Sequence, residues 1–139
     1  MSTLDSAMNH LADMTNAIGT VVSKTLGSNV SLAAGSAKAL VSVNLTPGTW
    51  VLAGCVRADG TAGGYRVVNI STLSASISTG AVCDSAYEQI WTTGSGYWCC
   101  SVSRIVQITT NTTYYLNVQQ SCTGTAASGQ CHLRAVRIV

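Results

Sequence analysis

Turn-forming residues recur along this chain after Gly27, and their spacing limits its possible folds more than any other feature. Pro, Gly, Asn and Asp cluster roughly every eight to twelve residues, with no helical pattern between the clusters. The intervening segments alternate as strands do, and several short strands at this spacing predict an antiparallel sandwich or barrel. The predicted strands are Val30–Leu32, Ala39–Leu45, Thr49–Arg57, Tyr65–Leu73, Trp98–Ile108, Thr113–Gln120 and His132–Val139.

The segment Thr49–Arg57 shows the alternation most clearly. Trp50 and Leu52 fall on one face of the predicted strand, and Val51 and Cys55 fall on the other. Both faces are apolar. A strand of this kind is covered on both sides, which predicts that one face packs on the domain's own core and the other on a neighbouring subunit.

The first 26 residues have a different period. Apolar residues there alternate spacings of four and three, which is typical of the seam of a coiled coil. We therefore expect a short N-terminal α-helix in residues 1–27, used for oligomerisation or docking, and a β-sandwich head domain in residues 28–139. A single helix of this length is marginally stable in water and needs a partner. The apolar seam residues are Leu4, Met8, Leu11, Ile18 and Val22.

The chain carries few charges. Charged residues make up 9% of the sequence, against roughly 25% in an average soluble domain. Neutral hydroxyls and amides can pair across an interface at little cost, so this surface favours permanent assembly with other copies over a lone monomer. The net charge is +2 and the basic residues are scattered singly, which argues against nucleic-acid binding. We also expect no membrane insertion, because no run of about 18 apolar residues is present. We expect no signal peptide, because the N-terminus lacks a basic n-region and an apolar h-region.

Groups suited to catalysis are scarce. Asp84 and Glu88 form one spaced pair of carboxylates, and His132 follows Cys131 directly, so that the two would face opposite sides of a strand. A solvated pair or a partner for an arginine is the ordinary role of such carboxylates. We expect no catalytic residues, no metal ligands and no cofactor, and hence a protein that is not an enzyme.

Aromatic residues gather in a Gly-, Ser- and Thr-rich part of the chain. On polar loops such rings can stack on sugars or anchor a protein partner, which would make them a contact for a receptor or other partner. The alternative is that they close the end of the core or contact another subunit. The residues in question are Tyr65, Tyr87, Trp91, Tyr97 and Trp98.

Six cysteines permit two interpretations. Cys122 and Cys131 flank a short polar segment like the base of a hairpin, so they form a possible disulfide in an oxidising compartment. Alternatively, all six are small, buried apolar side chains in a reducing one.

Three local patterns resemble the trimeric C-terminal head modules of phage fibres and related virion proteins, which have a C1q/TNF-like jelly roll. The first, in residues 45–54, contains Pro47-Gly48-Thr49-Trp50 and enters an inner strand. The second is a polar turn followed by Thr113-Tyr114-Tyr115-Leu116, and the third is the terminal Ala135-Val136-Arg137-Ile138. Their order and spacing match such modules over roughly residues 30–139.

The resemblance implies a mainly β, jelly-roll-like antiparallel sandwich that forms a homotrimer. It implies a non-enzymatic structural component of the virion of a tailed bacteriophage, made in the host cytoplasm. Such a component is a short fibre or spike head or a capsid-bound decoration protein, with capsid or tail proteins as partners. The alternative is a receptor- or glycan-binding head that mediates host attachment.

Overall fold

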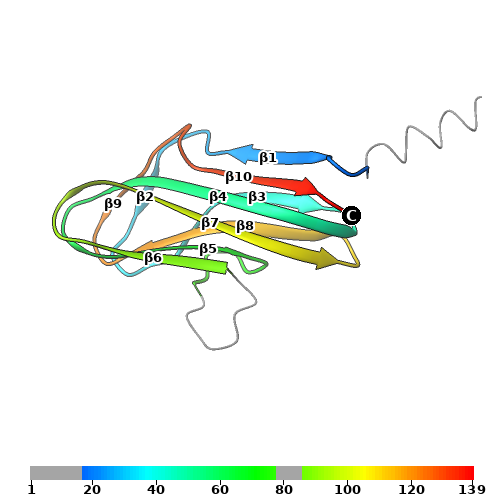
Figure 1. The fold of residues 1–139 in the computed structure, drawn as a ribbon. Helices are drawn as coiled ribbons and strands as arrows, with labels where there is room; N and C mark the ends of the chain where they lie inside the picture. The colour runs from blue at the N-terminus through cyan, green and yellow to red at the C-terminus, as the bar shows by residue number, and fades with distance from the viewer. Residues whose placement is uncertain (1–16, 78–85) are drawn as a thin grey trace, which may run out of the picture.

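The computed structural model describes residues 17–77 and 86–139, which form ten strands and no helix. No helix that could cross a membrane occurs among these residues. The strands build two antiparallel sheets that pack face to face (Figure 1). Their bounds are β1 (Val21–Thr25), β2 (Val30–Leu32), β3 (Lys38–Leu45), β4 (Gly48–Gly60), β5 (Gly64–Ser71), β6 (Ala86–Thr92), β7 (Gly96–Ile108), β8 (Thr112–Gln120), β9 (Gly124–Ala126) and β10 (His132–Arg137).

The long strand β4 organises the first sheet. It pairs along its whole length with β7, and its other edge pairs first with β10 and then with β9. β1 extends this sheet beyond β10, and β2 extends it beyond β9. The second sheet has the order β3-β8-β5-β6. Neighbouring strands in both sheets are therefore mostly far apart in sequence, as expected when a sandwich is closed by long connections.

The core lies between the two sheets and follows from the alternation along the strands. In β4, every second residue from Trp50 to Gly60 is buried, and β7 and β8 send their own alternate residues toward the same layer. Burying a large apolar side chain contributes roughly 1.5–3 kcal/mol. The largest fully buried apolar side chains are Trp50, Leu45, Leu52, Ile70, Leu116 and Leu133.

The Pro47-Gly48-Thr49-Trp50 turn and the end of the chain lie side by side. Thr49 N donates to the carbonyl oxygen of Val139 at 3.0 Å, and Ile138 N donates back to Thr49 O at 2.8 Å. Gly48 has a φ of +148°, and a Cβ at this position would lie 2.5 Å from Nε of Arg137. The glycine is required here because its backbone is left-handed and the terminal strand passes directly over it.

The seven strands predicted from turn spacing are present, with bounds that shift by a few residues. The sequence prediction missed three strands. β1 lay in the predicted helix, β9 lay in the predicted loop after Gly124, and β6 lay in a segment without clear alternation. β9 has only three residues, and its partner β2 is equally short, so neither carries a period that a pattern search can detect.

The predicted N-terminal helix is wrong for Val21–Thr25, which forms β1 and pairs with β10. Of the five predicted seam residues, Ile18 is exposed in the turn before β1, and Val22 packs against the core of the sandwich. Val21, Val22 and Thr25 are β-branched and favour a strand once β10 offers an edge to pair with. Leu4, Met8 and Leu11 lie outside the described residues.

Candidate functional site

An aliphatic row crosses the outward face of the first sheet. The pairing registers place Val21 opposite Val136, Val136 opposite Val51, and Val51 opposite Ile105. Four apolar side chains from four neighbouring strands therefore stand in one line on this face. Ile105 is 68% exposed, Val21 is also exposed, and the two central valines are half-buried. We call these four residues the aliphatic row.

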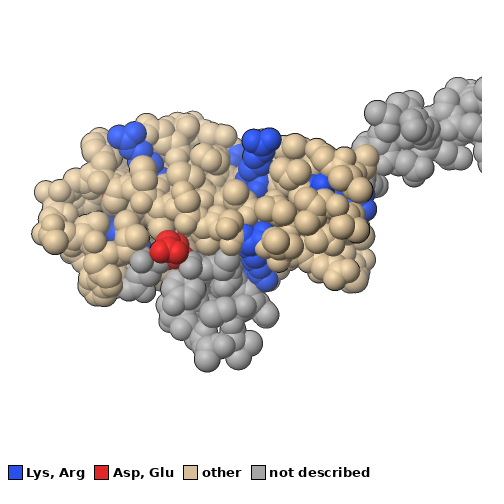
Figure 2. All heavy atoms as spheres, in the orientation of Figure 1, with Lys and Arg blue, Asp and Glu red and all other residues tan. Residues whose placement is uncertain are grey.

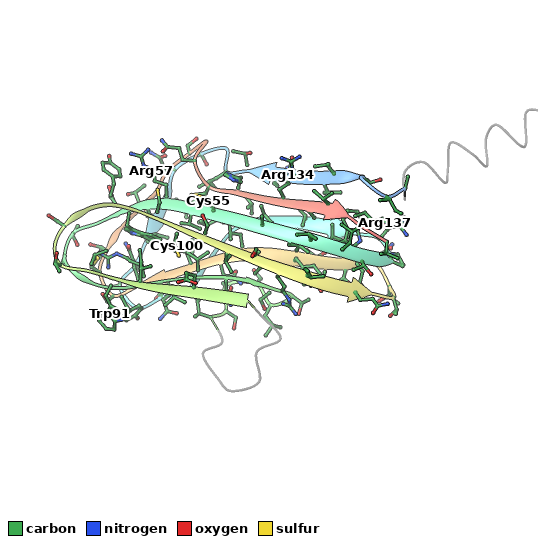
Figure 3. All side chains as sticks on the ribbon, in the orientation of Figure 1. Cys55, Arg57, Trp91, Cys100, Arg134 and Arg137 are labelled. Carbon is green, nitrogen blue, oxygen red and sulfur yellow. The ribbon has the colours of Figure 1, made fainter. Side chains whose placement is uncertain are left out.

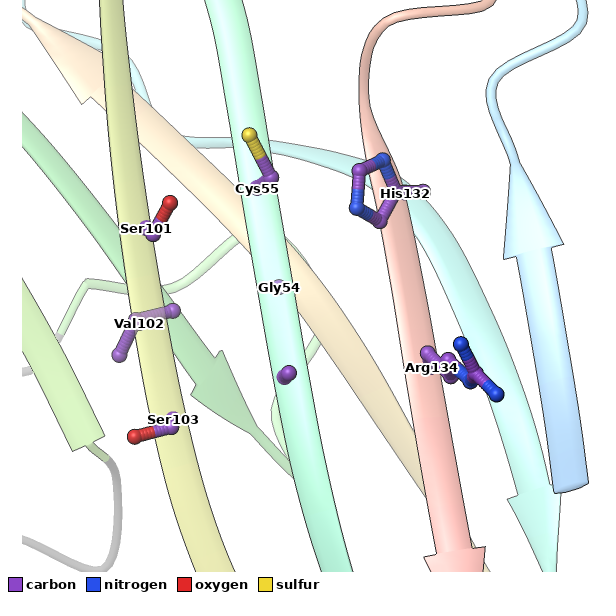
Figure 4. Close-up of a pocket in the computed structure, with 8 residues that line it drawn as sticks. Gly54, Cys55, Ser101, Val102, Ser103, His132 and Arg134 are labelled. Carbon is purple, nitrogen blue, oxygen red and sulfur yellow. The ribbon is translucent and has the colours of Figure 1, made fainter.

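A shallow hollow of about 410 Å³ lies on the same face, next to the aliphatic row. The register continues from Arg134 to Ala53 and Ser103, and one step further from His132 to Cys55 and Ser101. Figure 4 shows Cys55 and His132 on neighbouring strands, with Gly54 on β4 between the row that contains Cys55 and the row that contains Arg134. The hollow exists because Gly54, Ala53 and the serines are small. Its lining is mostly small and neutral, with the Arg134 guanidinium and the His132 imidazole as its large polar groups.

The outward face of the first sheet ends in a cation–π pair. The guanidinium of Arg57 lies 5.2 Å from the centre of the Tyr97 ring, and Arg57 also donates to Oε1 of Gln130. Tyr97 on β7 is the cross-strand partner of Asp59 on β4. This aromatic ring therefore belongs to the same face as the aliphatic row, and it is separated from the other exposed aromatic residues by the thickness of the sandwich.

An aromatic platform occupies the outward face of the second sheet. Tyr65 and Trp91 are register partners on β5 and β6, with ring centres 6.3 Å apart and planes at 77°, an edge-to-face contact. Nε2 of Gln119 donates to the Tyr65 hydroxyl at 3.0 Å. Trp91 is 72% exposed. Figure 3 shows it on the side of the sandwich opposite Cys55 and Arg134. We call Tyr65, Trp91 and Gln119 the aromatic platform.

The five aromatic residues considered as a partner contact or as a closure of the core are thus divided among different places. Tyr65 and Trp91 form a pair, and Tyr97 lies on the other sheet. Trp98 is a core residue, 5% exposed, and its Nε1 donates to Oε1 of the buried Gln120 at 3.0 Å. It therefore agrees with the alternative that these aromatic residues close the core, and it is not available as a surface contact. Trp98 points inward because it is one residue from Tyr97 on the same strand. The side chain of Tyr87 lies outside the described residues.

Cys122 and Cys131 are free thiols in the structure, so the possible disulfide between them is not formed. Each sulfur instead donates to a carbonyl of the β4 region, Cys122 to Ala62 at 3.4 Å and Cys131 to Arg57 at 3.3 Å. The polar segment between them does not act as a simple hairpin loop, because β9 in its middle joins the first sheet. Burial raises the pKa of the Cys131 thiol.

The other described cysteines lie on β4 and β7. Cys55 is half-buried and Cys99 is exposed, both on the outward face, whereas Cys100 points into the core. Burial, assisted by the nearby carboxylate of Glu88, raises the pKa of Cys100 to about 11. The interpretation of every cysteine as a buried apolar residue therefore fits Cys100, Cys122 and Cys131 but is wrong for Cys99.

Arg66 supports the aromatic platform from inside the molecule, a role that sequence reasoning missed. Its side chain is fully buried, and its guanidinium donates to Tyr65 O at 3.1 Å and to Ala62 O at 2.6 Å. These bonds restrain the backbone at the N-terminal end of β5. At this point the Arg66 side chain points inward and the Tyr65 side chain points to the outward face. A single arginine in an alternating strand carries no sequence signal that distinguishes it from a solvated one.

Ionisable groups are sparse on the face of the molecule that Figure 2 shows, where scattered basic side chains and one acidic patch interrupt a mainly neutral surface. Within the described ranges, no three side chains of His, Cys, Asp or Glu come together as metal ligands. Glu88 lies in β6 and is exposed, and Asp84 lies outside the described residues. The expectation that the chain is not an enzyme stays a prediction.

No protein-family model and no curated protein matches this sequence. The fold is similar to solved structures of low identity. The structure of Eiger TNF from S. frugiperda aligns with a TM-score of 0.52 and 7% identity over 86% of this chain and 93% of that one. A chain of infectious bursal disease virus, Gx strain, aligns with a TM-score of 0.54 and 14% identity, over 84% of this chain and 32% of the viral one.

A chain from the T13 viral particle of the same virus aligns with a TM-score of 0.51 and 11% identity, over 86% of this chain and 35% of that one. This protein thus spans the TNF chain almost entirely but only about a third of each viral chain. At these identities the likeness concerns the fold alone. The protein is an antiparallel β-sandwich of the jelly-roll kind.

Proposed function

We propose that this chain is a non-enzymatic structural component of a virus particle and that it forms a homotrimer through the outward face of the first sheet. The observation that carries the proposal is the aliphatic row, because four aligned apolar side chains on four neighbouring strands, two exposed and two half-buried, form one apolar strip on this face. Such patches mark protein–protein contacts in soluble proteins.

The size of this face suits an interface. Three rows of outward side chains cross all four strands from β1 to β7, and β4 and β7 alone carry three further rows. At ~4.8 Å per strand and ~7 Å per row, this face covers roughly 600 Å² per copy, or ~1,200 Å² for two copies in contact, which is above the ~1,000 Å² expected of a specific interface. The small residues around the hollow would let strands of two copies approach closely. The low content of charged residues, 9%, limits repulsion between copies.

The trimeric state and the location in a virion are inferred from the resemblance to phage head modules. The likeness of the sandwich to a chain of a virus structure supports the location in a virion. In the finer form of the proposal, the chain is a short fibre or spike head or a capsid-bound decoration protein of a tailed bacteriophage. The apolar faces lock the three subunits together, residues 1–16 attach the trimer to other virion proteins, and the second sheet faces outward.

The assembly is tested with Ile105→Asp, which places a charge in the aliphatic row at a site that contributes little to the core. Because the charge must be desolvated in the interface, we expect at least a ~100-fold weaker association. Analytical ultracentrifugation and native mass spectrometry report the mass. The matched control is Leu73→Asp, which changes a 60% exposed leucine in the segment after β5.

A salt-insensitive trimer that the control retains and Ile105→Asp loses supports the proposed assembly. A wild-type monomer at micromolar concentration contradicts it, and a stable dimer contradicts the number of three. The virion location has a separate test. Antibody labelling in electron micrographs of particles from the source should place the chain on their surface at a multiple of three copies, and its absence from purified particles contradicts that location.

A further inference from the structure

We propose that the aromatic platform is a binding site for a neutral saccharide. The site lies on the outward face of the second sheet, opposite the aliphatic row, and it does not depend on the proposed assembly. It comprises the exposed indole of Trp91, the ring of Tyr65 against it, and the hydrogen bond from Gln119 to the Tyr65 hydroxyl.

The indole is presented in a form suited to a sugar. Trp91 is 72% exposed, yet it stands on a strand that is paired with β5 and its edge-to-face contact with Tyr65 restrains its orientation. A ring that is ordered before binding loses little conformational freedom on binding. The face of an aromatic ring is electron-rich and attracts weakly positive hydrogens, such as those of the C–H groups on one side of a pyranose.

Polar groups beside the indole suit the hydroxyls of a sugar. The Tyr65 hydroxyl accepts a bond from Gln119 and still has its own proton to donate, and the Gln119 amide also contains a carbonyl oxygen that can accept. Arg66 holds the Tyr65 carbonyl from inside the molecule at 3.1 Å, which restrains the backbone under the platform. An apolar ring with adjacent hydroxyl and amide groups is the combination that recognises an amphipathic ring such as a hexose.

The surroundings favour a ligand without charge. Next to the platform, Val67 and Ser121 are neutral, and the neighbouring Arg66 is fully buried and points toward the other side of β5. Nothing in this group of residues would pair with a sialic acid carboxylate or a sulfate.

The platform is also bounded along the sheet. Val67 is only 3% exposed, and beyond it the segment after β5 is tied down over the sheet, with Ala75 N donating to Oδ1 of Asn117 at 2.9 Å. The open part of this face is therefore the end that holds Tyr65 and Trp91. Two aromatic side chains with one hydrogen-bonding amide suit one or two sugar rings.

Tryptophan fluorescence provides a direct test, because the three tryptophans differ in exposure. Trp50 is 1% exposed and Trp98 is 5% exposed, so a collisional quencher such as acrylamide reports on Trp91. The probes are methyl glycosides of neutral hexoses and N-acetylhexosamines, with sialylated and sulfated glycans as the anionic set. We expect at least one neutral glycoside at millimolar concentration to protect Trp91 from acrylamide, and the anionic set to protect it no better.

Variants of the full chain then locate the site. Trp91→Ala should weaken binding of the selected glycoside at least ~10-fold by isothermal titration calorimetry, and Tyr65→Phe should weaken it ~3- to 10-fold through loss of the hydroxyl. The matched control is Tyr97→Ala, an equally exposed aromatic residue on the other sheet, which should leave binding unchanged. Circular dichroism confirms that each variant is folded.

Several outcomes overturn the proposal. No protection by any neutral glycoside, equal binding by Trp91→Ala, or protection by anionic glycans alone would each show that the platform is not a site for neutral saccharides. If Trp91→Ala abolishes capture of a protein partner while no glycoside binds, the platform is a protein contact instead. None of these results changes the mass of the assembly, so they are distinguishable from failure of the proposed function.

Discussion

Individual small residues decide how closely the layers of this sandwich approach. Gly54 lies in the middle of β4, and a Cβ there would stand 2.6 Å from Cδ1 of Leu116 on the facing sheet. The absence of a side chain lets Leu116 and Ile70 reach the backbone of β4. On the outward side, the same stretch of β4 contributes Ala53 and Cys55 to the shallow hollow. Gly54 and its small neighbours Ala53 and Cys55 thus shape both the core and the face proposed for assembly.

Cys100 makes stability depend on pH. Its pKa is raised from 9.0 to about 11, chiefly by burial, so the folded protein keeps the thiol proton at pH values where the unfolded chain has lost it. The stabilising effect is complete below about pH 9 and disappears as the pH rises toward about 11. We expect the free energy of unfolding, measured with urea under reducing conditions, to decline over this range.

The variant Cys100→Ala should show a smaller decline than the wild type, since every other ionisable group is common to both. Cys99→Ala is the matched control, because Cys99 is adjacent but exposed, and it should keep the wild-type slope. An identical decline in wild type and Cys100→Ala would rule out this thiol as the source of the pH dependence.

At the scale of elements, β1 shows how a periodic pattern can mislead. The spacing of apolar residues continues the heptad pattern of the preceding segment as far as Val22, yet Val21–Thr25 is a strand on the edge of the first sheet. Its outward residue Val21 completes the aliphatic row and its inward residue Val22 packs on the core. The strand therefore contributes to stability and to the proposed interface from opposite faces.

Val22→Asp tests the role of β1. A carboxylate on the inward side of the strand loses its hydration, unless β1 detaches from β10 and loses its backbone pairing. In either case we expect the free energy of unfolding to fall by about 1–3 kcal/mol. The control is Ser23→Asp, which places the same charge on the outward side beside Arg134. Both changes are made in a chain that also carries Ile105→Asp, so that urea denaturation measures the stability of the single subunit and not of the assembly. Equal stability of the two variants would show that β1 does not pack as described.

At the scale of the whole molecule, the two outward faces have opposite characters and are suited to different partners. The first sheet carries an apolar row with few charges, and the second carries an ordered aromatic pair with hydrogen-bonding groups. A symmetric assembly through the first sheet, as proposed, would leave the second sheets on the outside of that assembly. Three aromatic platforms would then point away from the centre.

This arrangement predicts avidity. On a surface densely coated with the selected neutral glycoside, the trimer should bind ~100-fold more tightly than in a solution titration, because several platforms engage at once. The variant Ile105→Asp should lose this gain and keep the solution affinity per chain. Surface plasmon resonance at high and low ligand density measures the first quantity and calorimetry the second. A loss of solution affinity in Ile105→Asp would contradict the independence of the two faces.

The sequence by itself determined the fold class and most of the strands. Alternation and turn residues are local properties, and Thr49–Arg57 or Thr113–Gln120 carry enough of both to be recognised as strands without a partner. The sequence also showed that both faces of β4 are apolar. Strands β1, β6 and β9 were not, because short or edge strands exist only where a neighbouring strand supplies hydrogen bonds.

Only the tertiary structure decided which side chains share a surface. Register across β1, β10, β4 and β7 aligned the aliphatic row from residues as far apart in sequence as Val21 and Val136. It also separated Tyr97 from Trp91 and placed Trp98 in the core, although all three lie within a few residues of one another. The physical reason is that a strand alternates its side chains between two faces, while the pairing of distant strands determines which faces meet.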